Sequence, residues 1–116
     1  GETRALPLGT IAYARSGDKG GNGNVGIWTS DERAWPWLQQ TLSSEALREL
    51  APDWADVDIL RHEFPNLSAV HFVLRGLLGK GGSSNLRVDQ VGKAVGEYLL
   101  SKTVNIPVEL FDSNSR

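Results

Sequence analysis

The segment from Ala14 to Trp28, ARSGDKGGNGNVGIW, combines flexible backbone with charge. It holds five of the thirteen glycines of the chain, together with the charged residues Arg15, Asp18 and Lys19. Successive glycines let backbone N–H groups point into one concavity, which favours a bound anion. A guanidinium such as that of Arg15 can grip a carboxylate or phosphate, and Lys19 adds a point charge. The segment therefore predicts an anion-binding loop.

The chemistry of this loop predicts a set of site residues. Asp18 is the candidate catalytic residue, as a general base, unless it serves to orient the two cations. The predicted ligand-binding residues are Arg15, Ser16, Lys19, Gly20, Asn22, Asn24, Arg75 and Lys80. The alternative is an ordinary chain reversal in which Asp18 and Asn22 make turns. A hairpin needs only two residues to reverse, whereas about eight are expected here, and loops of that kind often carry function.

Other patterns in the chain are weak because their structural context is missing. The Gly21-x-Gly23-x-x-Gly26 spacing matches a dinucleotide fingerprint, which requires a following helix, and a strand is expected here. Ser16 and Lys19 match the S-x-x-K motif of serine acyl-enzymes, but the glycines between and after them disfavour the helix that it needs. His62 and His71 fall on neighbouring expected strands, and two histidines alone make a poor metal site. We expect no metal and no cofactor.

Composition limits the class of protein. The 116 residues form one domain, 1–116, with its core at about 9–111. A net charge of −2 argues against nucleic acid as a partner, and the absence of cysteine excludes disulfides and cysteine-ligated zinc. No apolar run approaches the roughly 18 residues of a membrane span, and no signal peptide is visible. The expected location is the cytoplasm.

Hydrophobic spacing and breaker residues predict the elements of the fold. Leu67–Gly79 is ambiguous between strand and helix, and its β-branched and aromatic content favours a strand. Pro36 predicts a kink or delayed start of the first helix, and Ser43 is a plausible cap for the next helical turns, which end before Pro52. The expected strands cover Gly9–Ser16, Asn24–Ser30, Asp56–Phe64, part of Leu67–Gly79 and Asn105–Phe111, and a later helix covers Gln90–Ser101.

The order of these elements predicts an α+β fold. From Asn24 onward it reads β-α-β-β-α-β, which is typical of a ferredoxin-like sandwich with helices on one face of a mainly antiparallel sheet. The first strand is an extra N-terminal strand. A solvated sheet face bearing His71, Arg61 and Arg75, with Trp28 nearby, would suit a ligand or a partner protein.

Three stretches carry a resemblance to a known family. ARSGDKGGNGNVGIW, FPNLSAVHFVLRGLLGKGGSSNLRVD and GKAVGEYLL resemble the C-terminal, ferredoxin-fold domain of the AtuA family, named for acyclic terpene utilisation, over about Gly9 to Pro107. The resemblance implies a cytoplasmic role in bacterial breakdown of isoprenoid or branched acids as CoA thioesters. It also implies a large α/β domain as partner. Pro36 departs from the ordinary helix former expected at its position.

Two functional hypotheses follow. In the first, the chain is an accessory or ligand-binding domain whose loop contacts an anionic group, such as an acyl-CoA, or the large catalytic domain. In the second, it is a non-catalytic assembly module that forms homo- or hetero-oligomers through its sheet face. An independent enzyme is the least supported, because no complete nucleophile–base or acid–base set is present. Whether the chain is catalytic stays open.

Overall fold

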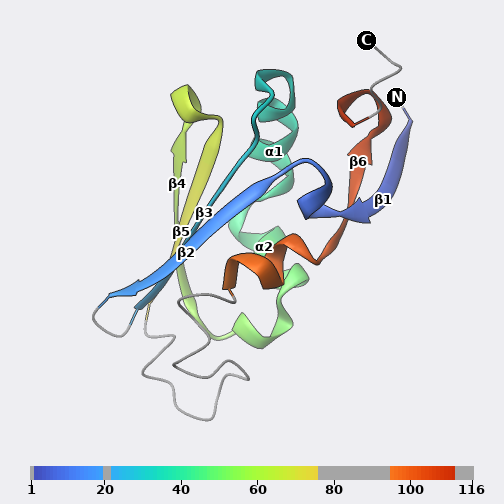
Figure 1. The fold of residues 1–116 in the computed structure, drawn as a ribbon. Coiled ribbons are helices and arrows are strands. Elements are labelled where there is room, and N and C mark those ends of the chain that lie inside the picture. The colour runs from blue at the N-terminus through green and yellow to red at the C-terminus, as the bar shows by residue number, and fades with distance from the viewer. Residues whose placement is uncertain (1, 20–21, 76–94, 112–116) are drawn as a thin grey trace.

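A four-stranded antiparallel sheet forms the centre of the molecule (Figure 1). The computed structural model describes residues 2–19, 22–75 and 95–111. The strands of the sheet are β2 (Tyr13–Lys19), β3 (Asn22–Trp28), β5 (Ala69–Arg75) and β4 (Asp58–Phe64), in this spatial order. The strand interpretation of the ambiguous Leu67–Gly79 segment is confirmed by β5.

The glycine-rich segment is a β-hairpin rather than a long loop. β2 and β3 pair along their whole length, from Tyr13 opposite Trp28 to Lys19 opposite Asn22. Only Gly20 and Gly21 separate them in sequence, and two glycines are a favoured pair for so short a connection. The expectation of a loop of about eight residues was therefore wrong. Glycine disfavours strands only weakly, and the alternating apolar residues on both flanks extend the ladder through it.

Short helices connect β3 to β4. A 3₁₀ turn, Glu32–Ala34, precedes α1 (Trp35–Thr41), so Pro36 lies in the first turn and the delayed start is confirmed. α2 (Ser44–Leu50) follows, and the Ser43 hydroxyl accepts a hydrogen bond of 3.0 Å from the Ala46 N–H, as a cap should. β5 then lies between β3 and β4, which gives the first split β-α-β unit of a ferredoxin-like fold.

The last strand leaves this sheet. Residues 95–100 are helical and lead to β6 (Thr103–Pro107), which pairs with β1 (Thr3–Pro7) in a separate two-stranded sheet. β1 was not expected from the sequence, and the expected first strand began at Gly9, where a 3₁₀ turn, Leu8–Thr10, precedes β2. β2 occupies the edge beside β3. The α+β class and the ferredoxin-like order of elements are confirmed, with this change in the pairing of the final strand.

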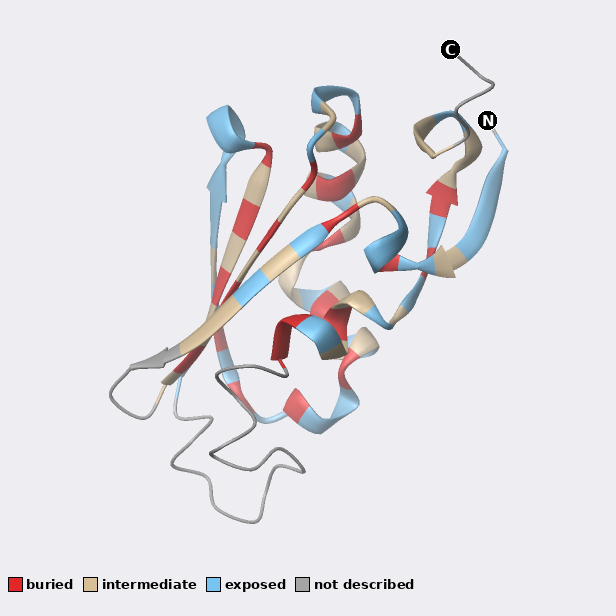
Figure 2. Cartoon of the chain, in the orientation of Figure 1, coloured by how far each residue is buried: buried red, intermediate tan, exposed pale blue. Residues whose placement is uncertain are grey.

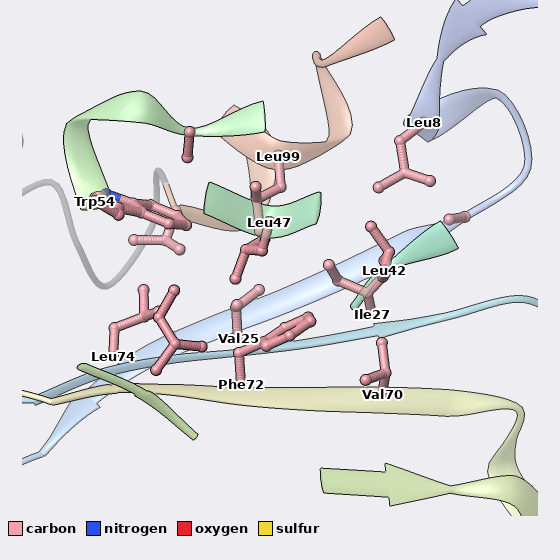
Figure 3. Close-up of a cluster of buried hydrophobic side chains, with 14 of the residues drawn as sticks. Leu8, Val25, Ile27, Leu42, Leu47, Trp54, Val70, Phe72, Leu74 and Leu99 are labelled. Atoms are coloured by element: carbon pink, nitrogen blue, oxygen red, sulfur yellow. The ribbon is translucent and has the colours of Figure 1, made fainter. Parts of the chain in front are cut away.

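One face of the four-stranded sheet is covered by helices, and the core lies between them. Side chains from β3 and β5 pack under those of α1, α2 and the helix at 95–100 (Figure 3). Residues along β3 and β5 alternate between buried and partly exposed (Figure 2). The fully buried side chains include Val25, Ile27, Leu38, Leu42, Leu47, Trp54, Val70, Phe72, Leu74 and Leu99. The opposite face of the sheet carries no helix among the described residues.

Candidate functional site: the open face of the sheet

The residues between the buried ones form a second surface, which we call the open face. Successive side chains of a strand point to opposite faces of a sheet, so the cross-strand register fixes its members. The open face comprises Tyr13, Arg15 and Gly17 of β2, Asn22, Asn24, Gly26 and Trp28 of β3, Ala69, His71, Val73 and Arg75 of β5, and Asp58, Leu60, His62 and Phe64 of β4.

Aromatic and aliphatic side chains are unusually exposed on this face. Tyr13 is 53% exposed, Phe64 46% and Leu60 39%. Tyr13 stacks on Trp28 with ring centroids 5.9 Å apart, and Phe64 meets the His71 ring edge-on at 6.5 Å. Contiguous apolar surface of this kind marks contact with a partner or ligand more often than isolated exposed residues do.

A row of one arginine, one glycine and two histidines crosses the middle of the open face. Arg15 on β2 lies opposite Gly26 on β3, Gly26 opposite His71 on β5, and His71 opposite His62 on β4. Burial and, second, the nearby His62 imidazole lower the pKa of His71 below its ordinary value. At the far end of the face, Arg75 and Asp58 form an exposed ion pair at 3.5 Å. The face therefore combines aromatic surface with cationic and titratable groups.

The structure separates the residues that the sequence placed in one loop. Arg15, Asn22, Asn24 and Arg75 belong to the open face. Ser16 lies on the covered face, where its hydroxyl accepts a 3.3 Å hydrogen bond from the Gly96 N–H and so joins β2 to the helix at 95–100.

Other predicted site residues cannot be placed as a cluster. The backbones of Asp18 and Lys19 pair with those of Gly23 and Asn22 in the hairpin, and their side chains lie outside the described part of the structure. Gly20, Lys80 and the segment Gly79–Asn85, whose glycines predict a second flexible loop, lie outside the described residues. The roles predicted for all of these residues stay predictions.

Arg61 corrects one expectation. Its register opposite Phe72 places it on the covered face, not beside His71 and Arg75. There its guanidinium donates to the carbonyl of Leu42, the residue after α1, at 2.7 Å, to the Gln39 carbonyl of α1 at 2.8 Å, and to Glu63 at 2.6 Å. The hydrogen bond from Arg61 and a second from Gln39 lower the pKa of the Glu63 carboxyl. Arg61 holds α1 against β4 and is unavailable to a ligand.

Sequence reasoning missed Tyr13, Leu60 and Phe64 as members of the open face, and it missed a groove beside that face. Leu60 is two residues from the start of β4 and Phe64 is its last residue, and the alternation along this strand was the signal that could have placed both on one face. An open groove of about 880 Å³ also lies where the end of β6 approaches the two 3₁₀ turns. It is lined by Thr10, Ile11, Tyr13, Ser30, Asp31, Glu32, Arg33, Ala34, Glu109, Leu110 and Phe111.

Within residues 2–19, 22–75 and 95–111, no group of three or more His, Cys, Asp or Glu side chains could hold a metal ion. In the same part of the chain, no helix has the length and apolar character needed to cross a bilayer.

The architecture defines an α+β ferredoxin-like domain whose sheet has one face packed on helices and one face uncovered in the described residues. A family model described as the AtuA ferredoxin-like domain matches residues 6–105. The chain therefore belongs to this family of domains. No curated protein matches the chain, and no solved structure matches it.

Proposed function

We propose that the chain is a docking domain of an AtuA-type protein, and that its open face binds the large α/β domain of that protein. The observation that carries the proposal is the exposure of Tyr13, Leu60 and Phe64 on a sheet face over which the described residues place no helix. Large apolar side chains at the centre of an interface supply most of its binding energy. The family of the domain supports this choice of partner.

The proposed setting is the cytoplasmic breakdown of isoprenoid or branched acyl-CoA compounds in bacteria. In this setting the large domain carries the chemistry, and the present domain supplies binding or positioning. An open face formed by four short strands gives a rigid platform for such a role.

Binding to the large domain tests the proposal. The chain and the large α/β domain are expressed as separate polypeptides, and their affinity is measured by calorimetry. Leu60→Ser and Phe64→Ser should each weaken binding about ten-fold, because each removes apolar area from the interface. Leu67→Ser is the matched control, since Leu67 is 68% exposed but lies in the 3₁₀ turn after β4, off the open face.

Two results would contradict docking to the large domain. If Leu60→Ser and Phe64→Ser bind as tightly as the unchanged chain, the open face is not the interface. If light scattering shows a homo-oligomer that these substitutions dissociate, the open face binds a second copy of the chain instead, as an assembly module would. Unfolding curves of each variant should stay within about 0.5 kcal/mol of the original, because the substituted side chains are exposed.

Binding of an acyl-CoA thioester is a second candidate function. It is favoured by the position of Lys19 at the end of β2, next to the glycine pair and one residue from Asp18. In this version Lys19, Gly20 and, from the other loop, Lys80 contact the phosphates. Titration of the chain with coenzyme A tests this candidate. Lys19→Ala should abolish saturable binding, and equal binding by that variant would contradict a binding site at the end of β2.

A further inference from the structure

A gap in the side chains of the open face lies between a cation and an imidazole. Gly26 stands between Arg15 and His71 in the cross-strand register and contributes no side chain. A Cβ atom added at residue 26 would lie 3.6 Å from Cδ2 of His71, so the edge of that ring borders the gap. Trp28 and Asn24, two residues away along β3, flank it on the same face.

Arg15 is not engaged by the rest of the described structure. It is exposed, and none of the ion pairs or hydrogen bonds among the described residues uses its guanidinium. Arg33, Arg61 and Arg75, by contrast, each pair with a carboxylate of the chain itself. A guanidinium has five N–H donors and no acceptor, and its fork geometry matches a carboxylate. Arg15 therefore offers donors that an acceptor from outside the chain can fill.

We infer that Arg15 and His71 together receive one carboxylate of the docking partner over Gly26. Two strand spacings place the backbones of Arg15 and His71 about 10 Å apart, which leaves room for a carboxylate between a long guanidinium side chain and a ring. Arg15 donates to one or both oxygens, and a ring N–H of His71 donates to the carboxylate from the opposite side. Trp28 supplies apolar surface beside the pair, which strengthens the charged interaction by excluding water.

The source of the carboxylate is the partner rather than a second copy of the chain. Among the described residues of the open face, the only carboxylate is that of Asp58, and Arg75 already pairs with it at 3.5 Å. A copy stacked face to face would therefore offer Arg15 no unpaired carboxylate. The inference rests on the proposed docking through the open face, and it adds the chemistry of the partner: an apolar surface that carries an Asp or Glu.

Acetate, the simplest carboxylate, probes this site in the 116-residue chain. The chain has two histidines, so the ring signals in the NMR spectrum are assigned with one His62→Gln variant. Acetate should shift the His71 ring signals saturably. It should also raise the pKa of His71, because a bound negative charge favours the protonated imidazole. His71 lies between His62 and Gly26 in the register of the strands. Arg15→Gln should weaken acetate binding roughly five-fold, because the charged donor is lost.

Matched controls separate this site from general salt effects. Acetamide has the same shape without the charge and should cause no saturable shift. Arg33→Gln removes another exposed cation, away from the open face, and should leave acetate binding unchanged. Shifts that do not saturate, or that saturate equally in Arg15→Gln, would overturn the inference.

The docking assay distinguishes this failure from a failure of the proposed function. If neither the unchanged chain nor its variants bind acetate and docking is intact, the carboxylate site is rejected and the interface is kept. If acetate binding depends on Arg15 while Leu60→Ser and Phe64→Ser leave docking unchanged, the interface is rejected, and with it the partner as the source of the carboxylate.

Discussion

At the scale of single residues, neighbours across the sheet matter more than neighbours in sequence. Arg15 and Ser16 are adjacent in the chain, yet one belongs to the open face and the other binds the Gly96 amide on the covered face. His62 and His71, nine positions apart, lie directly opposite each other. The strand period of two separates chain neighbours and brings distant residues together.

The histidine pair gives a prediction about pH. The pKa of His71 lies below its ordinary value of 6.5 because of burial and the nearby His62. The unfolded chain therefore binds a proton at a higher pH than the folded chain, and folding stability should fall as pH decreases from about 6.5 through the folded pKa. Urea unfolding at several pH values measures this slope.

A substitution of the neighbour checks the cause. His62→Gln should raise the pKa of His71 toward its ordinary value and flatten the slope, since the repulsion between the rings is removed. NMR titration of His71 follows the pKa directly. An unchanged pKa in that variant would assign the whole shift to burial.

At the scale of elements, the short helices depend on side chains from the sheet. α1 and α2 have seven residues each, too few to be stable alone. Arg61 stabilises the C-terminal end of α1 by donating hydrogen bonds to the carbonyls of Gln39 and Leu42. Trp37 of α1 donates from Nε1 to the Asn105 carbonyl of β6 at 3.0 Å. Long-range hydrogen bonds of this kind fix α1 between the two sheets.

Removal of the Arg61 guanidinium should therefore destabilise the fold. Its side chain is 19% exposed, and Arg61→Met leaves the carbonyls of Gln39 and Leu42 without their donors. We expect a loss of about 2 kcal/mol in the free energy of unfolding, measured by urea denaturation. Arg75→Met is the control, and it should cost less than about 0.5 kcal/mol because its ion pair is exposed. Equal losses in the two variants would contradict the role of Arg61.

At the scale of the whole molecule, the chain divides its strands between two sheets. β6 pairs with β1, yet its Val104 and Ile106 side chains are buried in the common core. The N-terminal strand, β1, is thus the pairing partner of β6, while β2 is the edge strand of the main sheet beside β3. This arrangement leaves one face of the main sheet without helices in the described structure.

Hydrogen exchange should reveal this division. β3 and β5 have a neighbouring strand on each side, so their amides should exchange slowest, near the rate of global unfolding. β1 has one neighbour and mostly exposed residues, so its amides should exchange fastest among the strands. Amide exchange followed by NMR measures both. Protection of β1 equal to that of β5 would mean that the two sheets open together.

Local spacing in the sequence determined the type and order of most elements. The β-branched and aromatic content of Leu67–Gly79 predicted β5, and Ser43 and Pro36 predicted how the helices begin. The resemblance to the AtuA domain was likewise readable from short runs of residues, and the family match confirms it. These features depend on interactions between residues close in the chain, which the sequence displays directly.

Only the tertiary structure decided which strands pair and which residues share a face. The sequence did not reveal that β6 joins β1, that the glycine segment continues two strands, or that Arg61 turns toward α1. Glycines disfavour a strand only by a small free energy, so contacts between residues far apart in the chain can override that preference and choose the pairing. For the same reason, Arg15, Gly26 and His71 became one row only when three strands had been placed side by side.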